Sequence, residues 1–172
     1  MREFLNDVEN VRVCVQLEVD RGARRETKKA IRLLNQALAL NFVCVLRHMR
    51  HFVTADRFGA RVVAQEFLEH TVRESEHSDL IAARIKELGG EITLERTTMT
   101  SRGHITCESS SEFEDIIRVD LDAERIAIET YGVMSNWLAD VDPTSSRILQ
   151  RILSLEEEHL EIMLNFVAVV ID

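Results

Sequence analysis

The sequence has little proline, glycine or aromatic side chain. Its 172 residues include one proline, six glycines and 5% aromatic residues. An all-β sandwich or barrel needs frequent turns and favours aromatic and β-branched residues, so this composition disfavours that class of fold. The hydrophobic fraction of 45% and the charged fraction of 30% are typical of a globular protein, which argues against disorder. We therefore expect long helices with few breaks.

Excess basic charge, a signal-peptide pattern and a long apolar run are also absent. The formal net charge is −9, the opposite of the balance in a compact nucleic-acid binder. The one basic cluster, within residues 21–29, is short and interrupted by Glu26, so we do not expect DNA binding. The N-terminal residues lack the apolar core of a signal peptide. The longest apolar stretches, near Ala37–Leu46 and Ile162–Ile171, are too short to span a bilayer, so we expect no membrane association.

Cysteine is scarce as well. Cys14, Cys44 and Cys107 are an odd number of residues at wide spacing. This set fits neither a disulfide framework nor a zinc site and indicates reduced thiols. We therefore expect a cytoplasmic protein.

Four long segments have the three- and four-residue spacing of apolar side chains that predicts amphipathic helices. The connections within the first pair and within the last pair are short, which predicts antiparallel hairpins. About twenty residues separate the second segment from the third, which is enough to cross a bundle. Short, long and short connections are those of an all-α, ferritin-like four-helix bundle with one long crossover between its second and third helices. The segments are Thr27–Ala55, Ala60–Leu88, Ser109–Ala139 and Asp142–Val170.

The residues before the first segment leave two alternatives open. Val8–Val19 could form an extra helix or belong to an arm. We therefore divide the chain into an N-terminal arm or extra helix over residues 1–26 and a ferritin-like bundle domain over residues 27–172.

The two halves of the bundle domain resemble each other. When Asn41 is superposed on Glu124, apolar residues of the first helix fall on apolar residues of the third. Each half then ends in a Glu-x-x-His motif, at Glu74–His77 and at Glu156–His159. The domain is therefore a hairpin that occurs twice.

The repeated motif predicts a metal centre. Glu and His three residues apart on a helix point to the same side, and Glu124 and Glu156 lie within apolar stripes that face the core. A buried carboxylate must be paired or must bind a metal, and few basic residues lie on these stripes. Two Glu plus two Glu-x-x-His motifs form the di-iron site of ferritin-like bundles, and such ligands suit iron, manganese or zinc. The predicted metal-binding and catalytic residues are Glu74, His77, Glu124, Glu156 and His159, with Asn41 at the sixth metal-ligand position.

On these motifs the chain resembles a bacterial ferritin of the bacterioferritin and Dps-like branch. The resemblance implies a ferroxidase that converts Fe(II) to Fe(III) with O2 or H2O2, and a hollow shell of identical subunits that stores or detoxifies iron. We expect no fifth helix after Val170. A chain without that helix resembles the subunits of shells of twelve copies, and a shell of twenty-four copies is the alternative. The resemblance covers about residues 30–172 and depends on Leu34–Leu40, Phe67–Gly90, Asp120–Glu124 and Leu155–His159.

The chain departs from that family at three positions. The family has Glu where this chain has Asn41, and it commonly has Tyr where this chain has His48. Bacterioferritin binds haem through a Met next to the second-helix Glu. This chain has Ser75 there, so we expect no haem by that route. His48 is expected beyond the metal ligands, and His70 is either an accessory ligand or a polar residue nearer the bundle end.

Asn41 changes the charge balance of the predicted centre. Two divalent ions carry four positive charges, whereas Glu74, Glu124 and Glu156 supply three negative ones. We therefore expect a weakened position at Asn41 and His77. Two alternatives stay open: a storage or structural shell subunit with little ferroxidase activity, and a non-storage di-metal oxidase or catalase on the same bundle.

We predict that Asn41→Glu strengthens the centre, because it supplies the missing carboxylate. The variant should bind more Fe(II) per chain and oxidise it faster than the native protein. Metal stoichiometry and the rate of Fe(II) oxidation measure this. Two irons per native chain, oxidised as fast as in the variant, would refute the impairment.

Overall fold

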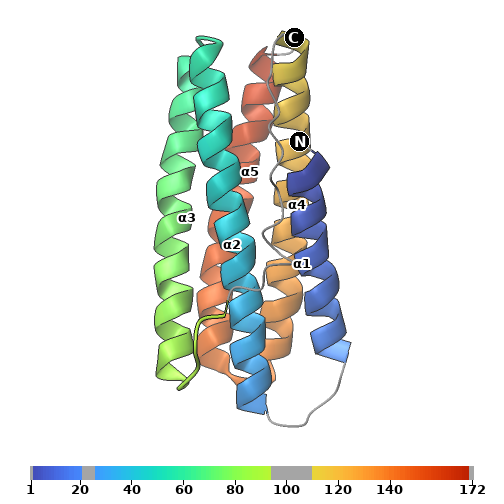
Figure 1. The fold of residues 1–172 in the computed structure, drawn as a ribbon, viewed down its shortest axis with the longest axis vertical. Coiled ribbons are helices and arrows are strands. Elements are labelled where there is room, and N and C mark those ends of the chain that lie inside the picture. Colours follow the sequence, from blue (N-terminus) through green and yellow to red (C-terminus); the bar gives the residue numbers. More distant parts are fainter. Residues whose placement is uncertain (1, 21–25, 94–109, 171–172) are drawn as a thin grey trace.

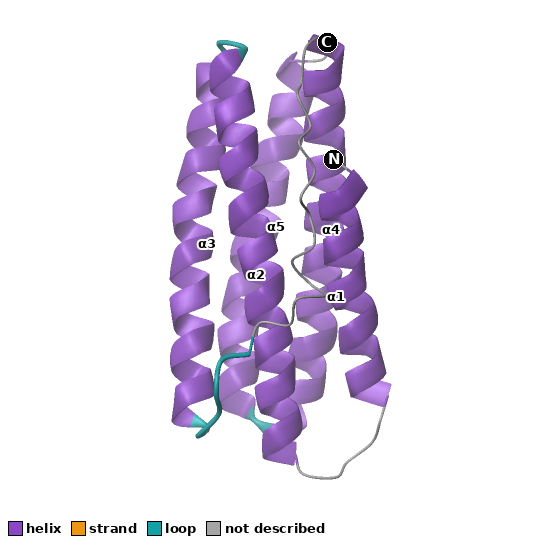
Figure 2. Cartoon of the chain, viewed as in Figure 1, coloured by secondary structure: helices purple, strands orange, loops and turns teal. Residues whose placement is uncertain are grey.

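The computed structural model describes residues 2–20, 26–93 and 110–170, and these residues form five helices and no strand (Figures 1 and 2). Residues 94–109, on which most of the predicted crossover falls, lie outside the described residues. The helices are α1 (Arg2–Asp20), α2 (Glu26–Arg57), α3 (Arg61–Glu87), α4 (Ser110–Val141) and α5 (Pro143–Val170).

Helices α2 to α5 form the four-helix bundle. α2 lies against α3 and α4 lies against α5 as antiparallel pairs, and further contacts join α2 to α4 and α3 to α5 (Figure 1). The end of α3 and the start of α4 lie at opposite ends of the bundle (Figure 1). The predicted all-α, ferritin-like class of fold is confirmed.

Turn residues end the helices where the sequence predicts. Gly59, between α2 and α3, and Gly89, after α3, have φ angles of 73° and 72°, a conformation that favours glycine. Pro143 occupies the first turn of α5, where a missing N–H costs nothing. Asp142 precedes it, and its carboxylate accepts hydrogen bonds from Arg84 of α3 and from the Ser145 hydroxyl, which ties the start of α5 to the end of α3.

The apolar core has two parts. The larger cluster includes Leu33 and Leu38 on α2 and Met134 and Leu138 on α4, and the smaller one includes Phe67 on α3 and Met163 on α5. Along each bundle helix, a group of buried polar residues falls between the residues of these two clusters. This polar layer is the candidate site.

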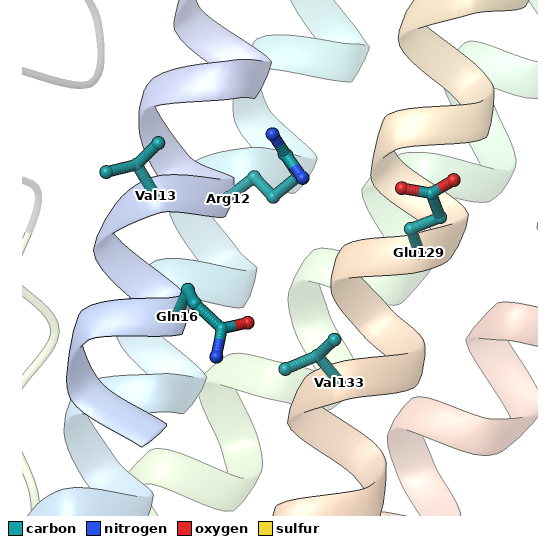
Figure 3. Close-up of a pocket in the computed structure, with 5 residues that line it drawn as sticks. All are labelled: Arg12, Val13, Gln16, Glu129 and Val133. Carbon is teal, nitrogen blue, oxygen red and sulfur yellow. The ribbon is translucent and has the colours of Figure 1, made fainter. Parts of the chain in front are cut away.

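Helix α1 lies outside the bundle, against α4 and α2. Val8, Val11 and Val15 recur at three- and four-residue steps and are buried in the larger core cluster. A pocket of about 230 Å³ lies between α1 and α4 and is lined by Arg12, Val13 and Gln16 of α1 and by Glu129 and Val133 of α4 (Figure 3). α1 is therefore an extra helix that covers part of the bundle.

Helix α2 is long and apolar enough to cross a membrane by length and composition alone. Polar residues interrupt its apolar runs, so the sequence does not show this as one continuous apolar stretch. In the structure, 67% of the apolar 18-residue stretch of α2 is buried inside the bundle. A core helix of a soluble protein passes the same test, so this is weak support for a membrane segment.

Candidate metal centre

A layer of buried polar side chains crosses the bundle between its two apolar clusters. All four bundle helices contribute to it, at the three- and four-residue steps that place side chains on one face of a helix. The layer contains Asn41, Arg47, His48 and His51 of α2, His70, Glu74 and His77 of α3, Asp120 and Glu124 of α4, and Glu156 and His159 of α5.

One group of candidate ligands, here called the carboxylate cluster, consists of His70, Glu74 and Glu156. One ligand atom from each residue lies within 4.8 Å of the others. The His70 Nε2 is 3.2 Å from a Glu156 oxygen and 3.6 Å from a Glu74 oxygen. The His77 Nδ1 has the same two distances to Glu156 and Glu74, so this predicted ligand lies at the edge of the cluster.

A second group, here called the histidine cluster, consists of His48, His70, Glu124 and His159. Its ligand atoms also lie within 4.8 Å of one another. The His48 Nε2 is 2.9 Å from Glu124, and the rings of His70 and His159 stack with centroids 3.3 Å apart. His70 belongs to both clusters, so they are adjacent in one layer. His48 was expected to lie beyond the metal ligands, but its ring and that of His70 both lie close enough to Glu124 and His159 to share one metal ion with them.

Asn41 lies beside the carboxylate cluster, but protein groups occupy both ends of its amide. The amide nitrogen donates a hydrogen bond to Glu74, and the amide oxygen accepts one from the Ser78 hydroxyl. In this geometry Asn41 supports Glu74, and its amide oxygen already accepts one hydrogen bond.

Arg47 is a buried member of the layer that the motifs do not predict. Its side chain is 0% exposed. Its Nε donates to Asp120 at 2.8 Å, and its Nη2 donates to Glu124 and lies 3.2 Å from the His48 Nε2. Core-facing Glu124 therefore has a basic partner, although few basic residues were expected on these stripes.

The sequence holds a weak signal for this position of Arg47. It follows Leu40 and Val43 and precedes His51 at three- and four-residue steps, so it falls on a buried edge of α2. His51 contacts the same carboxylate as Arg47, since the His51 Nδ1 is 3.0 Å from Asp120. Arg47, His51 and Asp120 thus extend the layer beyond the predicted ligands.

Several atoms of the layer have no hydrogen-bond partner in the described part of the chain. They include both oxygens of Glu156, both ring nitrogens of His70 and of His159, and one oxygen of Glu124. The nitrogen–oxygen pairs near 3.2 Å are close enough for hydrogen bonds but are not aligned for them. Because buried polar groups are nearly always satisfied, these atoms fit a bound cation. Oxygen and imidazole donors suit iron, manganese or zinc.

Ion pairs set the protonation of the carboxylate cluster. Burial lowers the pKa of His70, but Glu156 and Glu74 outweigh burial and raise this pKa to about 10. The same balance raises the pKa of His77 to about 9. Burial raises the pKa of Glu156, but the two histidines outweigh it and lower this pKa to about 2.

The histidine cluster has the opposite character. Burial, together with the charge on His70, lowers the pKa of His159 to about 3. Burial lowers the pKa of His48 well below its usual value. Burial raises the pKa of Glu124 to about 8 in spite of Arg47, while Arg47 and His51 outweigh burial and hold the pKa of Asp120 far below its usual value.

The bundle that contains this layer matches a known protein family. The ferritin-like domain family matches residues 31–169. The chain belongs to the ferritin-like family. The match spans all four bundle helices, so the layer lies inside the shared domain.

Two known relatives of the chain are bacterioferritins, the branch that the sequence motifs resemble. A bacterioferritin of Rhodobacter capsulatus is 26% identical over 136 residues, which are 78% of this chain and 80% of that protein. A bacterioferritin of Desulfovibrio desulfuricans is 28% identical over 141 residues, which are 81% of this chain and 75% of that protein.

A solved structure shows the same fold. The R. capsulatus bacterioferritin matches with a TM-score of 0.72 at 24% identity, over 83% of this chain and 85% of that one. That structure is described as having a metal-free dinuclear site and a haem iron in a crystallographic special position.

We predict that the metal-free protein loses stability as the pH rises from about 6.5 to about 10. The folded-state pKa values of His70 and His77 are about 10 and about 9, above the unfolded value of about 6.5. A group with a raised pKa stabilises the fold fully below its unfolded pKa, and this stabilisation is lost as the pH rises through the folded pKa. Denaturant titrations in chelator measure the free energy of unfolding.

The control for this prediction is His77→Gln, which removes one of the two titrating groups. The variant should lose less stability than the native protein over the same pH interval. Equal losses in both proteins, or no loss in the native one, would contradict the assignment.

Proposed function

We propose that this protein binds Fe(II) in the polar layer, oxidises it with O2 or H2O2, and stores or detoxifies the iron in a shell of its own copies. The observation that carries the proposal is the pair of adjacent ligand clusters, buried in the bundle core with unsatisfied oxygens and nitrogens. Membership in the ferritin-like family and the bacterioferritin relatives support it.

The residues of the layer would hold iron as substrate. Glu74 and Glu156, with His70 and His77, offer the more anionic position, and Glu124 and His159 offer the other. Carboxylates are hard, anionic ligands, so they stabilise Fe(III) over Fe(II) and favour loss of an electron to the oxidant. The apolar clusters on both sides of the layer limit the access of water.

Asn41 supports the proposal of a weakened ferroxidase. It is neutral, and its amide is engaged by Glu74 and Ser78. The layer therefore lacks the carboxylate that would complete a four-Glu centre. The buried contact between Arg47 and Glu124 favours the second candidate function, a storage or structural shell subunit with little ferroxidase activity.

Three further features belong to the proposal. The shell would contain twelve copies, or twenty-four. No haem would bind through the position of Ser75, which is exposed on α3 and carries a hydroxyl in place of a thioether. Cys14 and Cys44 are free thiols, which suits a reducing compartment such as the cytoplasm.

We predict that Glu156→Gln weakens Fe(II) binding by more than about tenfold, because it removes a charged ligand from the carboxylate cluster. Glu158→Gln is the matched control, since Glu158 lies on the same helix and is exposed. Anaerobic equilibrium dialysis with Fe(II) measures both affinities. Equal binding by the two variants would refute the site.

Size-exclusion chromatography with light scattering separates storage from the non-storage alternative. A shell of twelve chains of 19.8 kDa has a mass of roughly 240 kDa. A native mass of one or two chains would reject the shell and favour a non-storage oxidase.

A further inference from the structure

We infer that the centre holds one iron per chain, at the carboxylate cluster, because Arg47 is a permanent cation in the other half of the layer. The inference rests on the proposed function and specifies it. Arg47 touches Glu124 and not the iron, so it is a positioning residue: it determines which half of the layer takes a metal ion.

The contacts of Arg47 place its charge at the histidine cluster. Its guanidinium is fully buried, and it donates to both Asp120 and Glu124. The same Nη2 atom lies 3.2 Å from the His48 Nε2. Two of the four members of the histidine cluster therefore already contact a cation.

Local charge separates the two halves. The ion-pair partners that the structure shows for Glu74 and Glu156 in the described part of the chain are His70 and His77, so one dication would balance their two negative charges. In the other half, Arg47 cancels one of the two charges of Asp120 and Glu124. A dication there would leave a buried excess of positive charge beside a guanidinium that cannot lose its proton.

This assignment reverses one expectation from the sequence. Asn41 led us to place the weaker position at Asn41 and His77 and the better one at Glu124 and His159. The contact between Arg47 and Glu124 makes the latter position the poorer one. The weakness at Asn41 is smaller, since two carboxylates remain beside it.

The native protein tests the count directly. Fe(II) under anaerobic conditions, and Co(II) as a second probe with visible absorption that reports its ligands, are titrated into the native protein. We expect one tightly bound ion per chain, with a second ion bound more than about tenfold more weakly. Two equally tight ions would overturn the inference and leave the proposed function intact, whereas no bound ion would overturn both.

Variants of Arg47 test the cause. Arg47→Gln should bind two ions per chain and add a second Co(II) absorption component, because the guanidinium no longer occupies Glu124. Arg47→Lys keeps the charge and should still bind one. Arg84→Gln is the matched control and should also bind one, since Arg84 pairs with Asp142 and Glu87 at the far end of α3.

A measurement of folding protects the test against misfolding. Arg47→Gln leaves Asp120 and Glu124 buried without a cation, which threatens the fold. Thermal unfolding with and without Co(II) shows whether this variant is folded, and the Arg47→Lys protein tests the inference if it is not. A folded Arg47→Gln protein that still binds one ion, or an Arg47→Lys protein that binds two, would overturn the inference.

Discussion

Four carboxylates buried in the middle of an apolar bundle are the constraint on which the rest of the structure depends. Asp120, Glu74, Glu124 and Glu156 are each 1% exposed or less. Charges this deep are tolerated only with partners, and removal of one partner costs several kcal/mol. Two apolar clusters hold the layer from both sides, so the partners must come from within it. Five imidazoles and one guanidinium lie in the layer as possible partners, and unsatisfied oxygens remain for a cation.

The buried carboxylates of the two halves of the layer are compensated in different ways. In one half, a guanidinium permanently fixed by α2 compensates Asp120 and Glu124 of α4. In the other half, protons on His70 and His77 compensate Glu74 and Glu156. Protons can be exchanged for a metal ion, whereas a guanidinium cannot, so the second half is the one suited to reversible loading with iron. This asymmetry lies inside a domain whose two hairpins otherwise resemble each other.

Much of this structure follows from spacing alone. Apolar periodicity predicts the four bundle helices, and Gly89 and Pro143 mark helix ends because of their backbone geometry. The Glu-x-x-His motifs predict Glu74, His77, Glu156 and His159 in one layer because residues three apart share a helix face. The position of Arg47 does not follow from spacing. Which carboxylate a long side chain reaches depends on how α2 is rotated against α4, and one sequence does not specify that rotation.

The most direct test is anomalous diffraction at the iron absorption edge, from crystals loaded with Fe(II) without oxygen. The account predicts one strong peak per chain, bordered by His70, Glu74 and Glu156, with the Arg47 guanidinium still in contact with Glu124. Two peaks of equal height, or a single peak between Glu124 and His159, would contradict it.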